Sequence, residues 1–233
     1  MRIVVNHLTR MQPGYICVAG LDWESGQHVR PLPPEGRLRA ALLAQHGGPF
    51  ALGAIVELGE TRPVGHPPEV EDHRFAPRAA RQIGLLSPRQ LWETLQAVSA
   101  PRLRTLFGDA LTPRGRRGCG VDYGAGSVSL GCLVPTGPLH LYIQPREGRP
   151  GQVRLRVGDG EFDLDLAVTD ITLYGPDHVQ PDTVGVARVS AALRAGHPVL
   201  LSVGLTRAMT HDEGIPPTHW LQVNNIHLEP GDT

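Results

Sequence analysis

The chain has 233 residues, and all of its 22 basic side chains are arginine, so lysine is absent. This absence excludes a Schiff-base lysine, a pyridoxal-phosphate attachment site and the lysine of a phosphate-binding loop. The formal net charge is −1 and 40% of the residues are hydrophobic, which indicates a globular protein with no global attraction to nucleic acid or membranes.

The cysteines, the apolar segments and the N-terminal residues together predict where in the cell the protein is found. The three cysteines form no CxxC pair, no apolar run reaches the roughly 18 residues of a membrane-spanning helix, and the first residues do not resemble a secretory signal. The sequence therefore predicts a cytoplasmic protein with reduced thiols. It contains no cofactor motif, and no cofactor is expected.

The first 64 residues are predicted to be mainly strands with one helix. Residues 37–45 place Leu38 and Leu42 on one face, which predicts a helix, and Gly47 with Gly48 is expected to end it. The strands are expected at 2–8, 15–21, 27–32 and 54–61.

The middle of the chain differs in composition. Residues 63–82 hold four prolines and little periodicity, so they are expected to run extended over a surface. Ser87 followed by Pro88 predicts the start of a helix, and Pro101 is expected to begin a second, short helix. The glycine- and arginine-rich residues 112–127 are expected to form a mobile loop.

The last hundred residues return to a strand-like composition. Asp182 is predicted to cap a helix that runs to about Ala195. The strands are expected at 128–134, 139–144, 153–157, 161–168, 170–174, 199–206 and 220–228.

Two segments of the chain resemble each other. Residues 56–62 and 201–207 both read apolar-x-apolar-Gly-x-Thr-Arg, and a predicted helix precedes each of them. In both halves the element order is strand, strand, strand, helix, strand, which is the order of an OB barrel. We therefore predict a mainly β protein with two OB-like Greek-key barrels, at residues 1–65 and 128–233, joined by an arginine-rich helical insert at residues 66–127.

Four motifs extend this prediction. They are Asn6-His7-Leu8-Thr9-Arg10-Met11 with Gly14 and residues 17–20, His46-Gly47-Gly48-Pro49-Phe50, Thr61-Arg62-Pro63 with residues 68–72, and residues 219–228. Together they resemble the bacterial dual OB-containing domain family over nearly the whole chain. The resemblance implies the tandem OB fold and brings no catalytic residues. By general OB analogy it implies binding of a ligand or of nucleic acid.

Three Thr-Arg pairs end or follow predicted strands and are candidate anion contacts. A hydroxyl and a guanidinium can both donate to a phosphate, and arginine can do so through two parallel bonds. The alternative is structural, with each arginine paired to a carboxylate at a strand end. The pairs are Thr9-Arg10, Thr61-Arg62 and Thr206-Arg207.

The arginines of the middle segment are a second candidate for contacts to nucleic acid. Residues 1–117 hold 15 Arg and 10 acidic residues, whereas residues 118–233 hold 7 Arg and 13 acidic residues. Bound nucleic acid is therefore expected to contact the N-terminal half and the insert more than the C-terminal barrel, unless these arginines form only a solvated face. They are Arg102, Arg104, Arg114, Arg116 and Arg117.

Aromatic residues are few, which argues against a strong general binder of single strands. Trp220 is the best candidate for stacking on a base, because Thr218 and His219 before it suggest a strand that enters from an exposed loop. The alternative is a Trp in the core or at a barrel end. Tyr15, Trp23 and Tyr142 also lie on or near predicted strands.

Two acidic clusters raise the question of a metal or acid–base site. On an extended segment Glu69, Glu71 and His73 would share one side, next to Asp72. The alternative is a solvated acidic loop that meets the arginine-rich segment. The cluster His211-Asp212-Glu213 allows the same two interpretations, and no metal site or catalytic residue is predicted.

These patterns favour a non-enzymatic binding module. The preferred hypothesis is salt-sensitive binding of single-stranded nucleic acid, or of nucleotides, in the groove between the barrels. One alternative is a protein-interaction subunit of a larger assembly such as a defence system. Another is a metal-dependent nuclease that uses Glu69, Glu71, Asp72 and His73.

Overall fold

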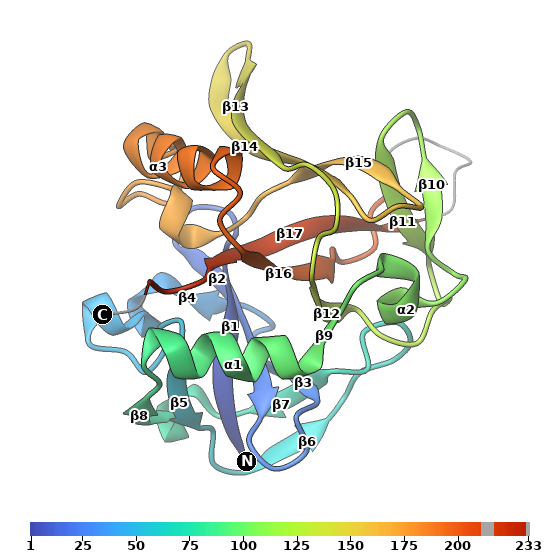
Figure 1. Cartoon of the computed structure of the whole chain (residues 1–233). Helices are drawn as coiled ribbons and strands as arrows, with labels where there is room; N and C mark the ends of the chain where they lie inside the picture. The colour runs from blue at the N-terminus through green and yellow to red at the C-terminus, as the bar shows by residue number, and fades with distance from the viewer. Residues whose placement is uncertain (211–216, 232–233) are drawn as a thin grey trace.

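The computed structural model describes residues 1–210 and 217–231, and the predicted cluster at His211, Asp212 and Glu213 lies outside these ranges. The fold is mainly β with OB-like barrels, as predicted (Figure 1). Within the described ranges, no helix is both long and apolar enough to cross a membrane.

The first half is built on an eight-stranded sheet with the order β6-β7-β3-β2-β1-β5-β8, in which β4 pairs with β2. Its pairs are antiparallel except β3 and β7, which run parallel. The strands are β1 (Arg2–Arg10), β2 (Tyr15–Asp22), β3 (His28–Leu32), β4 (Leu38–Arg39), β5 (Ala54–Glu57), β6 (Thr61–Pro63), β7 (Asp72–Phe75) and β8 (Arg81–Leu85). Because β7 and β8 belong to this sheet, the first sheet extends beyond residue 65.

The second half contains a six-stranded sheet with the order β10-β11-β17-β16-β12-β9 and a three-stranded sheet with the order β13-β14-β15. Figure 1 shows the β13–β14 hairpin projecting from the top of the molecule. The strands are β9 (Ser99–Ala100), β10 (Thr112–Arg114), β11 (Gly118–Asp122), β12 (Leu130–Leu133), β13 (His140–Arg146), β14 (Arg149–Gly158), β15 (Asp163–Ala167), β16 (Val199–Leu205) and β17 (Thr218–Leu228). The three-part domain division stays a prediction, and residues 66–127 contribute strands to both large sheets.

Three α-helices flank these sheets: α1 (Pro88–Val98), α2 (Leu103–Phe107) and α3 (Thr183–Arg194). The predicted caps are confirmed. The Ser87 hydroxyl oxygen accepts a hydrogen bond from the main-chain amide of Gln90, and the main-chain amide of Ser87 donates one to Oε1 of Gln90, so the two residues form a capping box. Asp182 caps α3 by accepting from the Val184 amide. Each helix buries one face, and α1 does so with Trp92 and Leu95.

Three predicted elements were wrong. Residues 37–45 form β4 and two 3-10 turns, η1 (Ala40–Leu42) and η2 (Ala44–His46), because Leu38 pairs with Ile16 and the chain then folds back at Gly48. Residues 112–122 form the β10–β11 hairpin and not a mobile loop. Residues 171–173 form the 3-10 turn η4 (Ile171–Leu173) instead of a strand. A further 3-10 turn is η3 (Pro77–Ala79).

The two halves meet where β1 crosses β17, and the junction is polar and buried. Asn225 accepts a hydrogen bond from the Leu8 amide at 2.7 Å and donates to the Leu8 carbonyl at 3.3 Å. The Asn224 side-chain nitrogen lies 3.0 Å from Nδ1 of His7. Amide side chains that satisfy buried main-chain groups across a crossing fix the relative position of the two strands.

Candidate nucleic-acid interface

The three-stranded sheet β13-β14-β15 has one apolar face and one solvent face. Leu141 and Leu155 point into the core of the second half, whereas His140, Tyr142 and Arg156 alternate with them on the other face. In the antiparallel register His140 lies opposite Arg156, and Tyr142 lies opposite Arg154. The alternation therefore brings rings and guanidinium groups together on a solvent-facing surface.

The Tyr142 ring is the centre of this surface. The His140 ring stacks on it at 5.2 Å between centroids with an interplanar angle of 13°, and the Arg156 guanidinium lies 5.7 Å from its centroid. The Tyr142 hydroxyl donates to Asp165 at 2.7 Å. These contacts hold a half-buried aromatic ring in one orientation among groups that stack and carry positive charge.

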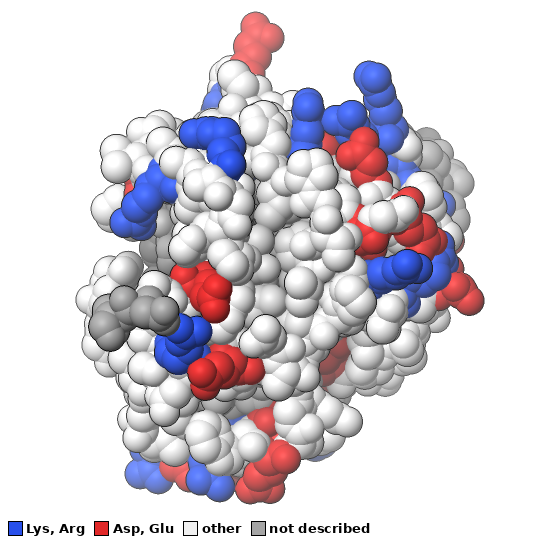
Figure 2. Space-filling view, viewed as in Figure 1, with Lys and Arg blue, Asp and Glu red and all other residues white. Residues whose placement is uncertain are grey.

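Ion pairing separates the arginines around this sheet into two groups. Arg154 pairs with Asp165 at 3.2 Å, and Arg117 pairs with Asp163 at 3.4 Å. Four exposed arginines make neither an ion pair nor a side-chain hydrogen bond with any described residue, and they are Arg116, Arg146, Arg149 and Arg156. Figure 2 shows basic side chains gathered at the top of the molecule, with acidic ones between them. We call the solvent face of β13-β14-β15 with Arg116 the stacking face.

The predicted insert arginines lie partly beside this face. The β10–β11 hairpin is held against β15 by a hydrogen bond from the Asp165 amide to the Arg117 carbonyl at 2.9 Å. Arg114 pairs with Asp122 at 2.5 Å, and Arg104 pairs with Glu161 and Asp109. Arg102 is exposed and precedes α2. Arg104, Arg114 and Arg117 therefore face carboxylates, whereas the alternative given for these arginines was a solvated face.

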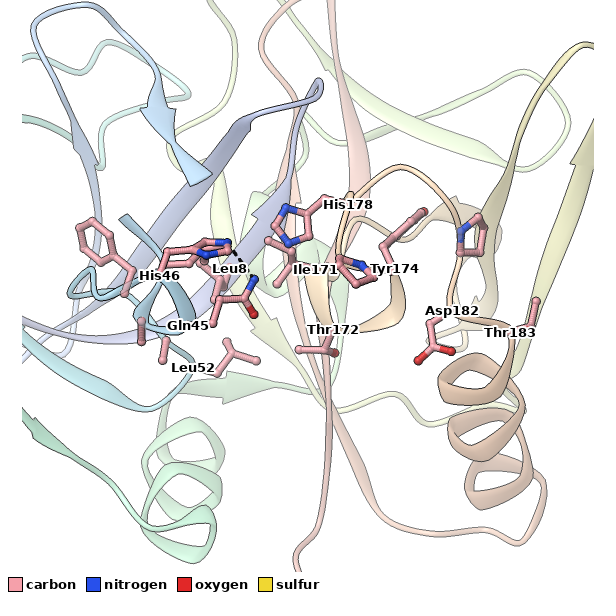
Figure 3. A pocket seen from close by; sticks show the side chains of 17 residues that line it. Leu8, Gln45, His46, Leu52, Ile171, Thr172, Tyr174, His178, Asp182 and Thr183 are labelled. Atoms are coloured by element: carbon pink, nitrogen blue, oxygen red, sulfur yellow. Dashed lines mark hydrogen bonds between the residues drawn. The ribbon is translucent and has the colours of Figure 1, made fainter. Parts of the chain in front are cut away.

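The pair Thr9-Arg10 lies elsewhere, at the end of β1 beside Tyr174, which lines the groove between the two halves. Thr9 is buried, and the Arg10 guanidinium lies 4.3 Å above the Tyr174 ring. The groove has a volume of about 890 Å³, and Figure 3 shows His46 lining it from the first half and His178 from the second. Burial lowers the pKa of His178, and nearby His46 lowers it further.

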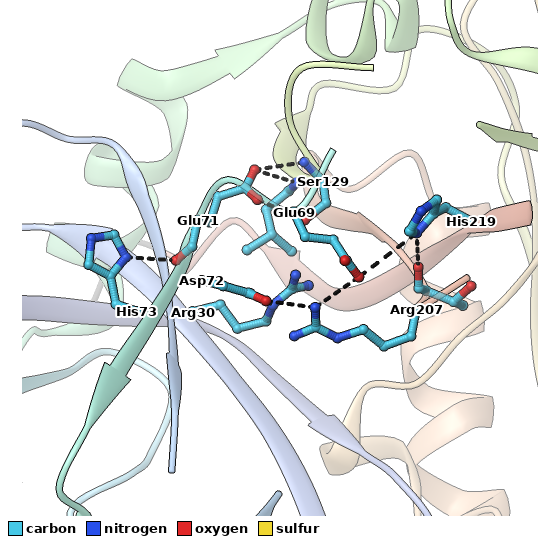
Figure 4. Close-up of polar contacts among 10 residues, drawn as sticks. Arg30, Glu69, Glu71, Asp72, His73, Ser129, Arg207 and His219 are labelled. Carbon is cyan, nitrogen blue, oxygen red and sulfur yellow. Dashed lines mark hydrogen bonds and ion pairs between the residues drawn. The ribbon is translucent and has the colours of Figure 1, made fainter. Parts of the chain in front are cut away.

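The pairs Thr61-Arg62 and Thr206-Arg207 occupy a third region. Arg62 is exposed on β6, whereas Arg207 follows β16 and is held by Asp72 at 2.6 Å and Glu69 at 2.8 Å (Figure 4). Thr206 accepts a hydrogen bond from the Trp220 amide at 2.9 Å. The predicted residues therefore lie in three separate regions and do not form one groove.

Trp220 packs below the β10–β11 hairpin. It pairs in register with Gly120, and a side chain at Gly118 would come within 3.3 Å of its ring. The ring is half-buried against this hairpin, and its role in stacking on a base stays a prediction. Glycine at 118 and 120 lets the hairpin approach β17 closely.

The acidic residues 69–73 hold the two halves together. Glu71 is buried and accepts hydrogen bonds from the Ser129 amide at 2.7 Å and hydroxyl at 2.8 Å, while Asp72 contacts Arg30 at 2.6 Å (Figure 4). The expectation that Glu69, Glu71 and His73 share one side assumed an extended segment, but residues 69–72 form a turn in which the Asp72 amide donates to the Glu69 carbonyl at 3.2 Å. In the described part of the chain, no three His, Cys, Asp or Glu side chains are placed to hold a metal ion.

Comparison with known proteins gives the family. The chain matches the dual OB-containing domain over residues 1–226. It belongs to this family. No curated protein matches it. A solved structure of a murine DNA-binding protein bound with double-stranded DNA aligns over 99% of this chain and 98% of its own, with 11% identity and a TM-score of 0.29. A similarity this low carries no argument about fold or function.

The motifs that predicted this family serve the junction. Leu8 from the first motif bonds Asn225 from the last, and Asp72 bridges Arg30 and Arg207. The sequence places Tyr142 on or near a predicted strand but favours Trp220 for stacking on a base. The alternation of His140, Tyr142 and Gln144 with apolar neighbours was the available signal.

Proposed function

We propose that this dual OB protein is a non-enzymatic module that binds single-stranded nucleic acid on the stacking face. The observation that carries the proposal is the Tyr142 ring, stacked with His140 and Arg156 on a solvent-facing sheet beside unpaired arginines. Bases of any sequence stack on aromatic rings, and arginines follow the phosphate backbone, so the two features together suit a single strand.

The arginines without an ion pair decide where on the molecule we place the binding site. The charge balance of the two halves predicts contacts in the N-terminal half and the insert. However, Arg104, Arg114 and Arg207 already face carboxylates, and a paired guanidinium is a poorer phosphate ligand than a free one. Arg116, from the predicted insert cluster, remains part of the proposed site.

Fluorescence anisotropy with a labelled 5′-hydroxyl oligonucleotide tests the proposal. We expect binding that weakens as salt rises, and we expect Tyr142→Ala to weaken it by about 5- to 150-fold because one stacked base is lost. Tyr142→Phe keeps the ring and loses the hydrogen bond to Asp165, so its affinity should stay within about twofold of the unaltered protein.

Two results would overturn the proposal. The first is no binding to mixed-sequence DNA or RNA at low salt. The second is equal affinity for the unaltered protein and for Tyr142→Ala, with both variants folded by circular dichroism. A stoichiometric protein that copurifies without nucleic acid would favour the alternative of a subunit that docks another polypeptide.

A further inference from the structure

A second hollow lies in the first barrel, away from the stacking face. Its volume is about 680 Å³, which is within the range of pockets that enclose small ligands. Three segments far apart in sequence form its walls: the end of β3 with the turn that follows, β4 with η1, and η3. Tyr15 of β2 lies opposite Arg39 in register, so the two side chains share one face.

The charge in this hollow is unbalanced. Arg37, Arg39 and Arg78 are all exposed, and none of them makes an ion pair or a side-chain hydrogen bond with a residue that the structure describes. One carboxylate, that of Glu35, is among the residues that line the hollow. Arg37 and Arg39, which lie two residues apart, and Arg78 of η3 therefore line a space with a net positive charge.

The remaining walls are aromatic and apolar. The Arg37 guanidinium lies 5.9 Å from the centroid of the Tyr15 ring. Leu38, Leu42 and Pro77 add apolar surface. A ligand that fits this lining has a flat, largely apolar part and an anionic part, because the rings and aliphatic groups suit the first and the arginine forks suit the second.

We propose that this hollow binds a nucleoside 5′-phosphate, with the base against Tyr15 and the phosphate between Arg37, Arg39 and Arg78. Inorganic phosphate would leave the apolar walls uncovered, and a nucleoside would leave the three arginines without an anion. The same chemistry is present in a free nucleotide and at the 5′-phosphorylated end of a strand. This inference uses none of the residues of the stacking face, so either proposal can fail alone.

Calorimetric titration with adenosine 5′-monophosphate, adenosine and inorganic phosphate tests the inference. We expect the monophosphate to bind at least tenfold more tightly than either fragment. Arg78→Gln should weaken this binding by about tenfold or more, since it removes a charge-assisted bond. Arg188→Gln, at an exposed position of α3 outside both the hollow and the stacking face, is the matched control, with the same loss of charge, and should leave this binding unchanged.

A second arm distinguishes the two sources of the phosphate. In the Tyr142→Ala background, 5′-phosphorylated and 5′-hydroxyl oligonucleotides are compared by anisotropy. Preference for the phosphorylated strand, abolished by Arg78→Gln, assigns the hollow to strand ends, whereas binding of the mononucleotide alone assigns it to free nucleotides. The inference is overturned if neither the mononucleotide nor the 5′-phosphorylated strand binds at millimolar concentration. It is also overturned if both ligands bind the Arg78→Gln and Arg39→Gln variants as tightly as they bind the unaltered protein.

Discussion

Replacing Asp72 by Asn should destabilise the protein by about 3–5 kcal/mol. Asp72 and Arg30 have side chains that are 6% and 5% exposed, and their charged atoms are 2.6 Å apart. Removing one partner of a buried pair leaves the other charge without compensation, which is the origin of this magnitude. Arg207 contributes little to the loss because it is 47% exposed and keeps Glu69 as a partner.

Urea unfolding followed by tryptophan fluorescence measures this change as a shift in the midpoint, with buried Trp92 as one reporter. Glu57→Gln is the control, because it breaks an exposed pair with Arg81 and should shift the unfolding midpoint far less than Asp72→Asn does. The double variant Arg30→Met with Asp72→Leu should recover much of the stability, since no buried charge remains. A loss below about 1 kcal/mol for Asp72→Asn would refute the reasoning.

Three further predictions concern acid stability, salt and capping. Burial lowers the pKa of His28 and of His227 to about 4, so below pH 6.5 the unfolded state binds more protons than the folded state. Each of these two histidines should therefore lower the free energy of unfolding by up to about 1.4 kcal/mol per pH unit as the pH falls towards 4. Urea titrations across this pH range should show a smaller loss for His28→Gln than for the unaltered protein. Arg156→Gln should reduce the slope of log affinity against log salt by about 0.7 for a single-stranded oligonucleotide, and an unchanged slope would show that Arg156 contacts no phosphate. Ser87→Ala removes the capping box of α1 and should lower the free energy of unfolding by about 1 kcal/mol, whereas Ser87→Asp should retain most of it.

The sequence predicted elements whose cause is local. Ser87 with Pro88, and Asp182 before an apolar repeat, are N-terminal signals that act within one turn of helix, and both helices begin as expected. The alternation of apolar and polar residues in β13 and β14 is likewise local, because it requires only that one face of each strand is buried. Elements of this kind can be predicted because their determinants lie a few residues apart in the chain.

Residues 37–45 could not be predicted, because distant contacts override their helical pattern. Leu38 is recruited to β2 through Ile16, and Leu43 forms a bridge with Phe50. Gly48 approaches Leu42 so closely that a Cβ would lie 2.2 Å from its backbone. Helix propensity is a weak preference, and these long-range contacts outweigh it.

The hairpin at residues 112–122 could not be predicted either, because the sequence does not show what its glycines do. Gly115 adopts a φ of 61° at the turn, whereas Gly118 and Gly120 allow close contact with β17. Glycine in a sequence indicates mobility and close packing equally well, and only the partner strand decides between them. Cys119, between the two glycines, is fully buried.

The sequence directs attention to arginines and aromatic residues but does not show which of them lie together. Whether Arg104 or Arg156 makes an ion pair depends on carboxylates that only the fold brings near. Arg37 and Arg39 lie two residues apart, but no local pattern links them to Arg78, which lines the same hollow.

The central claim is that single-stranded nucleic acid binds on the stacking face. Photo-crosslinking of an oligonucleotide that contains 4-thiouridine, followed by mass spectrometry of the peptides, tests it most directly. We expect crosslinks in β13 and β14 around Tyr142, and their loss in Tyr142→Ala. Crosslinks confined to the groove around His46 and His178, with none in β13 or β14, would contradict the account.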